Sequence, residues 1–177
     1  IGGSLLIAEK AGGTGGDADG NLTLGSNSTL DAVSANGDVW IGTNRTNSGT
    51  VNGELNALES AATVNIDVDD FNVGVARGTG VGQGTLRWNQ QEAIHANEVF
   101  FGRGSNAVSI LDVPAGGTLR LGTEADRIGN LWLAYNDTGA GGTVVTDLDF
   151  TVTNPTFEAL IGGSLLIAEK AGGTGGD

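Results

Sequence analysis

The stretch "IGGSLLIAEKAGGTGGD" at residues 1–17 occurs a second time, letter for letter, at residues 161–177. Seventeen identical residues in one register do not arise by chance, and the two ends of a closed globular domain have no use for the same sequence. We therefore interpret residues 1–160 as one full period of a longer repeat, and residues 161–177 as the start of the next identical period. Self-similarity at a fixed period is typical of solenoids and arrays.

A shorter unit recurs inside this period. Its first element is a short apolar segment that ends in a small residue, as in "LLIA" at residues 5–8 and "VWIG" at residues 39–42. The element returns as "FNVG" at 71–74, "VFFG" at 99–102, "LWLA" at 131–134 and "LLIA" at 165–168. The spacings are 34, 32, 28, 32 and 34 residues, so five units fill the 160-residue period, with coils that start near residues 4, 38, 70, 98 and 130. The small residue predicts a corner of the chain, where glycine tolerates left-handed backbone angles.

Two further elements follow in each unit. The second elements are "NLTLG" at 21–25, "ELNAL" at 54–58, "TLRWN" at 85–89, "TLRLG" at 118–122 and "DLDFT" at 147–151. The third elements are "TLDAV" at 29–33, "TVNID" at 63–67, "EAIHA" at 92–96, "ADRIG" at 125–129 and "FEALI" at 157–161. Alternation of apolar and polar residues predicts strands with one buried face, and glycine, asparagine and aspartate mark the turns between them.

A single unit cannot fold alone. It buries about six large apolar side chains, worth about 2 kcal/mol each, whereas ordering costs on the order of 1.5 kcal/mol for each of its roughly 30 residues. Neighbouring units must therefore share one core and one hydrogen-bond ladder. We expect an all-β fold: a parallel β-helix, or β-solenoid, of about five coils per 160-residue period with three short strands per coil. Five coils would advance about 24 Å.

The composition excludes several classes of protein. The 177 residues include 32 glycines but only two prolines, no cysteine and no methionine, so disulfides and thiolate metal sites are excluded. The chain has eight lysines and arginines and 21 aspartates and glutamates, which gives a formal charge of −13. This charge repels nucleic acid phosphates and anionic membranes. We expect no nucleic acid partner, and no membrane insertion, since no stretch approaches the roughly 18–20 apolar residues of a membrane helix.

Strings such as "VGVARGTGVGQGTLRW" at 73–88 and "GGTLRLGTEADRIGNLWLAYNDTGAGG" at 116–142 resemble the glycine-rich repeats of bacterial autotransporter passengers and filamentous-haemagglutinin-like adhesins. The resemblance covers all five units and implies a right-handed parallel β-helix in a secreted bacterial protein. It implies an extracellular or cell-surface location. Neither a translocator barrel nor a secretion domain nor a binding head is recognised in these residues, so the resemblance leaves the surface system open.

A repeat whose last segment copies its first presents, at one end, the surface that the other end meets. Head-to-tail contacts that do not close on themselves give filaments. We therefore expect a structural repeat of a secreted bacterial surface filament, sheath or adhesin stalk, rather than an enzyme, with copies of itself as its partner along the fibre and laterally. The alternative is a carbohydrate-binding or polysaccharide-active β-helix protein, whose partner would be a surface polysaccharide. The acidic "DVDD" at 67–70 and the single histidine, His95, favour a solvated loop and a surface position over catalytic roles.

The stretch "GGTGGDADGN" at 12–21 partly resembles the calcium-binding nonapeptide of RTX β-rolls. Asp17, Asp19 and Asn21 are candidate calcium ligands, because hard cations prefer such oxygens. The nine-residue unit does not recur in tandem, so a glycine-rich polar turn explains these residues equally well. No other cofactor is predicted.

The middle positions of the first elements form a second candidate site. If Leu5 and Ile7 point inward, then Leu6, Trp40, Asn72, Phe100 and Trp132 stack on the opposite face. Leu6, Trp40, Phe100 and Trp132 form a candidate lateral contact stripe, for the bundling of fibres or for stacking on sugars. The alternative is that a loop or flanking segment covers this column as a second small core.

Overall fold

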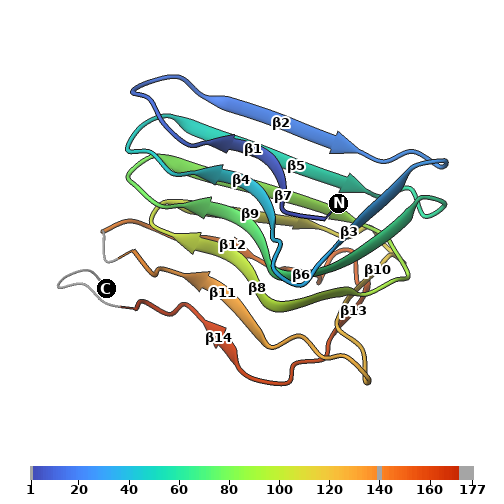
Figure 1. Ribbon diagram of the computed structural model, residues 1–177. Helices are drawn as coiled ribbons and strands as arrows, with labels where there is room; N and C mark the ends of the chain where they lie inside the picture. The colour runs from blue at the N-terminus through green and yellow to red at the C-terminus, as the bar shows by residue number, and fades with distance from the viewer. Residues whose placement is uncertain (1, 139–140, 172–177) are drawn as a thin grey trace.

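The computed structural model describes residues 2–138 and 141–171, and within these ranges it contains strands but no helix. Every strand pair in this part of the chain is parallel, and the strands stack as a β-solenoid of about five turns. Figure 1 shows the coils one above another, with the N-terminal coil at the top and the C-terminal segment at the bottom. The predicted fold class is confirmed.

Each coil contributes one strand to each of three columns. The first column contains β1 (Leu5–Lys10), β4 (Val39–Asn44), the second half of β6 (Thr63–Ala76), the second half of β8 (Ile94–Gly104), β11 (Asn130–Tyr135) and β14 (Leu165–Ile167). The second column contains β2 (Ala18–Thr23), β5 (Thr50–Ala57), β7 (Val81–Trp88), β9 (Ala107–Asp112) and β12 (Val145–Asp147). The third column contains β3 (Thr29–Ser34), the first halves of β6 and β8, β10 (Thr118–Leu121) and β13 (Thr156–Ala159).

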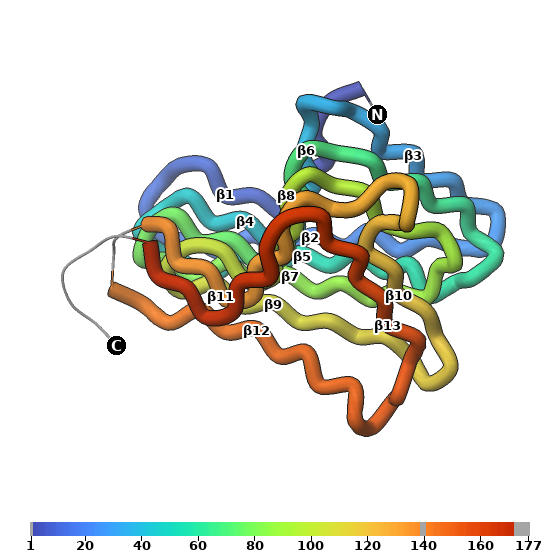
Figure 2. Tube along the Cα trace, turned by 90° about the horizontal axis from the view of Figure 1, so that it is seen from below, coloured from blue at the N-terminus to red at the C-terminus, as the bar shows by residue number. Residues whose placement is uncertain are grey.

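The register of the first column follows the repeat in the sequence. Its paired positions are Leu5, Val39, Phe71, Val99, Leu131 and Leu165, one residue from each coil. Except for Leu165, these side chains belong to a continuous apolar core, and Val39, Phe71 and Val99 are fully buried. Such burial of β-branched and aromatic side chains on one face of each strand is what holds neighbouring coils together. Figure 2, seen from below, shows the strands of successive coils following one another within each column.

The small residue of the repeat lies inside the first strand and not at a corner, so that expectation is wrong. Ala8, Gly42, Gly74, Gly102 and Ala134 all have left-handed backbone angles, with φ between 56° and 78°, yet pairing continues beyond them. At Gly42 and Gly74 the backbone of the second column passes so close that it leaves no space for a side chain. A Cβ atom added to Gly42 would lie 1.7 Å from the carbonyl oxygen of Gln83, and one added to Gly53 would lie 2.2 Å from the Gly42 nitrogen.

The fourth coil also departs from the expected assignment. Its second strand is β9, where Leu111 pairs with Leu86 of β7, whereas "TLRLG" at 118–122 forms the third strand β10. The expected third element, "ADRIG" at 125–129, is mostly a turn, and of its residues Ile128 forms an isolated bridge with Ile161. Both segments alternate apolar and polar residues, so alternation alone could not tell them apart. The other expected second and third elements overlap strands of the predicted columns, but "DLDFT" at 147–151 does so only at Asp147, the last residue of β12.

Candidate interaction surfaces

The outer face of the first column carries two neighbouring rows of side chains. The row that contains the candidate stripe runs through Leu6, Trp40, Asn72, Phe100, Trp132 and Leu166 in consecutive coils. Three positions further along each strand, Arg103 and Tyr135 pair with each other and lie on the same face. The left-handed residue between the two rows reverses the usual alternation of strand side chains, so residues three positions apart lie on the same face.

Aromatic rings and arginines pack tightly on this face. The ring centroids of Phe100 and Trp132 are 5.8 Å apart with nearly parallel planes, and those of Trp132 and Tyr135 are 4.3 Å apart. The Arg103 guanidinium lies 4.0 Å from the Phe100 centroid, and Arg45 lies 5.0 Å from that of Trp40. These geometries are those of ring stacking and cation–π contacts.

An ion-pair network holds the arginines in place. Asp137 accepts hydrogen bonds from Arg77 at 2.6 Å and from Arg103 at 3.1 Å, and Arg103 also donates to Asp70 at 2.8 Å. Burial raises the pKa of Asp70 in spite of Arg103. Burial also acts to raise the pKa of Asp137, but the hydrogen bonds and charges of its two arginines outweigh this effect, so the pKa of Asp137 is lowered.

The two stripe tryptophans are tied to acidic residues. Trp40 Nε1 donates to Asp38 at 3.1 Å, and Trp132 Nε1 donates to Glu98. Phe100 is only 3% exposed, both tryptophans are half-buried, and Leu6 is 43% exposed. The stripe therefore exposes Leu6 and parts of the two tryptophans, whereas Phe100 is covered by its neighbours. A lateral contact at Leu6, Trp40, Phe100 and Trp132 stays a prediction.

The three candidate calcium ligands lie at alternate positions at the start of β2. Asp17 accepts from the Thr50 backbone nitrogen and Asp19 from the Asn52 side chain, both at 2.7 Å, and Asn21 accepts from Thr23 at 3.0 Å. Alternate residues of a strand are roughly 6.6 Å apart, so the structure does not bring all three to one point. Asp19 and Asn21 line a groove on the outer face of the second column. Calcium binding there stays a prediction.

The "DVDD" segment lies within β6, where the third strand of one coil bends into the first strand of the next. Its carboxylates divide: Asp69 and Asp70 lie with Asp38 in a group whose oxygens are within 4.8 Å of one another, whereas Asp67 pairs with His95 in the neighbouring strand. His95 has a neighbour that the sequence did not predict, because its Nδ1 is 3.0 Å from Asp126. Asp69 accepts from Asn97, and Asp38 and Asp70 are bonded as described above. Hydrogen bonds to neighbouring residues therefore explain why Asp38, Asp69 and Asp70 lie together.

A polar ladder runs beside the first column and was not predicted. The residue just before the paired apolar positions of the first column is Ser4, Asp38, Asp70, Glu98, Asn130 or Ser164. Asp38 donates its backbone nitrogen to Ser4 Oγ at 3.0 Å, and Asp70 donates its own to Asp38 Oδ1 at 3.2 Å. The Ser164 nitrogen donates to Asn130 Oδ1 at 2.7 Å. The signal in the sequence is a short polar side chain at one fixed position of every unit.

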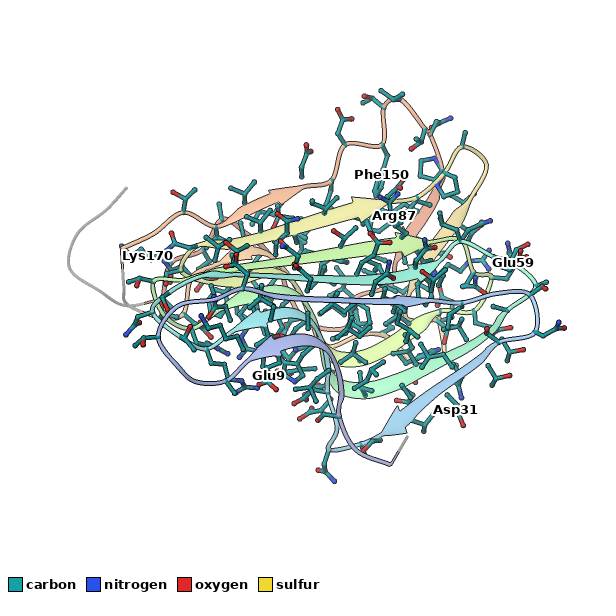
Figure 3. The ribbon with its side chains drawn as sticks, turned by 90° about the horizontal axis from the view of Figure 1, so that it is seen from above. Glu9, Asp31, Glu59, Arg87, Phe150 and Lys170 are labelled. Atoms are coloured by element: carbon teal, nitrogen blue, oxygen red, sulfur yellow. The ribbon has the colours of Figure 1, made fainter. Side chains whose placement is uncertain are left out.

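The two ends of the stack differ in their exposure. Ile7 in β1 is 6% exposed, whereas Ile167, its equivalent in the second copy, is 66% exposed, and Leu165 is 54% exposed. β1 pairs with β4 and packs against β2 of its own coil and β5 of the next coil. In the described part of the chain, β14 pairs with β11 alone. Figure 3, seen from the opposite end, shows side chains filling the interior, with Asp31 and Glu59 at the rim.

Comparisons with protein families, with curated proteins and with solved structures found no match to this chain. Within the described residues there is no helix long and apolar enough to cross a membrane.

Proposed function

We propose that this chain is a structural repeat of a secreted bacterial surface filament, sheath or adhesin stalk, in which the solenoid supplies length and stiffness. One observation carries the proposal: a single ladder runs β1-β4-β6-β8-β11-β14, and its first and last strands have the same sequence. Such a ladder extends by repetition, because every coil meets its neighbours in the same way. The extracellular setting rests on the resemblance of residues 73–88 and 116–142 to autotransporter and haemagglutinin-like repeats.

The distribution of charged side chains supports a mechanical role. The arginines of the outer face are engaged with carboxylates, as Arg103 is with Asp70 and Asp137 and Arg45 with Glu9. Ionic side chains paired in this way join neighbouring coils, so they reinforce the backbone ladder. The net charge of −13 keeps the surfaces of separate fibres apart except where an apolar stripe overcomes the repulsion.

The proposal is tested by imaging the native material. We expect long fibres with an axial repeat of about 24 Å, since five parallel strands at about 4.8 Å each make one period. Labelling with an antibody against the outer face of the second column would show whether the chain lies along the fibre. Isolated compact particles without an axial repeat would contradict the structural role.

A second candidate function is favoured by one cluster. Phe100, Trp132 and Tyr135 form an ordered aromatic surface with Arg103 beside it, and aromatic faces stack on sugar rings. A carbohydrate-binding role predicts that the chain binds a surface polysaccharide and that Trp132→Ser abolishes the binding. Trp40→Ser, on a coil without this cluster, is the matched control. Equal binding by the parent and both variants would exclude the cluster as the sugar site.

A further inference from the structure

We propose that Asn36 is a site of spontaneous deamidation, at which the folded chain converts its own asparagine into isoaspartate or aspartate. The dipeptide "NG" occurs twice in the sequence, at residues 36–37 and 52–53. Asparagine followed by glycine is especially prone to this reaction, because glycine has no Cβ atom to hinder attack by its backbone nitrogen. The structure exposes the first dipeptide and protects the second. This chemistry is independent of the proposed function.

The reaction needs water as its only co-reactant. The backbone nitrogen of Gly37 attacks Cγ of Asn36, the Cγ–Nδ2 bond breaks, and Nδ2 leaves as ammonia with the proton of the Gly37 amide. Water then opens the resulting succinimide ring. Breaking the bond between the Gly37 nitrogen and Cγ gives aspartate, whereas breaking the bond to the backbone carbonyl carbon gives isoaspartate, in which the main chain passes through the side chain. Either product replaces a neutral amide with a carboxylate.

Asn36 lies in an exposed turn between β3 and β4, where the first coil passes into the second. The Gly37 nitrogen donates to the Ser34 carbonyl at 3.1 Å and closes a four-residue turn with Asn36 at its third position. The Asn36 side chain is exposed and makes no hydrogen bond to the described residues. Its Cγ can therefore reach the Gly37 nitrogen once a single backbone hydrogen bond opens.

The packing of this corner requires glycine at position 37. A Cβ atom there would lie 2.7 Å from the carbonyl oxygen of Gly3 and 2.8 Å from Cβ of Ser34. A bulkier residue, which would slow the attack on Asn36, therefore cannot occupy the position without displacing the backbone. The reactive dipeptide is thus a consequence of the close contact between the first coil and this turn.

The second dipeptide lies inside a paired strand. Asn52 and Gly53 belong to β5, which pairs with β2 on one side and with β7 on the other. The Asn52 side chain donates to Asp19 at 2.7 Å. Gly53 is buried, and a Cβ atom on it would lie 2.2 Å from the Gly42 nitrogen. Ring closure requires rotation of the backbone at Asn52, so the reaction there has to wait until both ladders open.

Isoaspartate at position 36 would disturb the corner. It inserts one extra carbon into the main chain before Gly37, whose carbonyl accepts a hydrogen bond from the Asp69 nitrogen at 2.8 Å. This bond joins the corner to the equivalent corner of the following coil. The new carboxylate also adds negative charge two residues before Asp38, which already lies close to Asp69 and Asp70. We therefore expect the modified corner to open more readily than the parent corner.

The test is to age the folded chain in mildly alkaline buffer and to analyse its tryptic peptides by mass spectrometry. Trypsin places Asn36 in residues 11–45 and Asn52 in residues 46–77, so each site is followed in its own peptide. Electron-transfer fragmentation distinguishes isoaspartate from aspartate. In the folded chain we expect Asn36 to react at least about tenfold faster than Asn52. In urea the two rates should converge, because neither site is protected there.

Asn36→Gln is the matched control, because the same attack would then have to form a six-membered ring. It should abolish the product at position 36 and keep the Tm of the fresh protein within about 1 °C, since the side chain has no partner to lose. As isoaspartate accumulates, the Tm of the parent should fall by about 4–8 °C through loss of the two backbone bonds of Gly37. The Tm of Asn36→Gln, aged in parallel, should not show this fall.

Two results would overturn the proposal. One is equal reaction at Asn36 and Asn52 in the folded chain, which would mean that the fold does not distinguish the two sites. The other is an unmodified Asn36 in the folded chain under conditions in which the unfolded chain reacts, which would mean that the turn protects it.

Discussion

The close approach of the first and second columns predicts a strong effect of one methyl group at Gly53. A Cβ atom there would lie 2.2 Å from the Gly42 nitrogen and 2.5 Å from the Ile7 carbonyl oxygen. Real Cβ contacts below 3.0 Å are essentially absent from proteins. Both neighbours are backbone atoms of paired strands, so no side-chain rotation can relieve the contact. The two columns would have to separate by about 1 Å, which forfeits packing around the new atom.

We expect Gly53→Ala to lower the free energy of unfolding by about 3 kcal/mol, the upper end of overpacking effects in well-packed cores. For a chain of this size such a loss lowers the Tm by about 6–12 °C. Urea unfolding followed by circular dichroism and by tryptophan fluorescence measures the change, and agreement of the two signals shows whether the coils unfold together.

Two other glycines serve as matched controls. Gly25→Ala places its Cβ 3.9 Å from the nearest atom, so its effect should stay within about 0.5 kcal/mol. Gly116→Ala meets no atom within 4 Å but has φ of 71°, so it should cost about 1 kcal/mol from backbone strain alone. If Gly53→Ala is no more destabilising than Gly25→Ala, the close contact between the two columns is refuted.

Three further predictions concern the outer face and the acidic segment. Asp137→Asn should cost about 2 kcal/mol at pH 7. Because the folded-state pKa of Asp137 is lowered, this stability is present above the ordinary pKa of 3.8 and is lost as the pH falls through the folded-state pKa. The urea midpoints of parent and variant should therefore converge at acidic pH, below the ordinary pKa. If calcium binds at Asp17, Asp19 and Asn21, the Tm should rise by a few degrees in excess calcium and fall back to its original value when a chelator is added. An unchanged Tm would contradict calcium binding at this site. Trp40→Ser combined with Trp132→Ser should thin fibre bundles seen by electron microscopy if the stripe is a lateral contact, whereas unchanged bundles with a lower Tm would indicate that the rings serve only the fold.

The sequence was sufficient for the fold class and for the register of the first column, because each coil repeats one apolar pattern at one place. Leu5, Val39, Phe71, Val99 and Leu131 could be aligned without a structure, and they are the residues that pair. Parallel coils share a core only if equivalent residues stack on one another. An alignment of the repeats therefore predicts the register of the strands.

The second and third columns were less predictable, because their turns vary in length. The second strand begins 13 residues after Leu5 in the first coil, at Ala18, but only eight residues after Val99 in the fourth, at Ala107. The later segment "TLRLG" has a similar pattern and a spacing closer to that of the first coil, so the sequence favoured it over "AVSILD" as the second strand. The pairing of Leu111 with Leu86 shows that "AVSILD" is the second strand of the fourth coil. This pairing joins residues of different coils, so it is not visible in the pattern of one coil.

The chemistry of the outer face depends on a backbone detail that sequence alone did not reveal. Arg103 stacks on Phe100, three positions earlier, only because the intervening Gly102 has φ of 78° and reverses the alternation of side chains. Strict alternation would place these two residues on opposite faces. A small residue recurs at that position in every coil, but such a residue is equally typical of a corner of the chain, so the sequence alone did not predict the arrangement.

In the proposed fibre, the candidate stripe would continue from one period into the next. Within one period its apolar members are divided by Asn72, which is buried and separates Trp40 from Phe100. In joined periods Leu166 lies on Trp132, and the next copy's equivalent of Trp40 follows it. Phe100, Trp132, Leu166 and that tryptophan then form one run over four consecutive coils, interrupted once per period by the asparagine. Because neighbouring fibres repel one another through their negative charge, apolar runs that recur about every 24 Å would fix their relative stagger as well as hold them together.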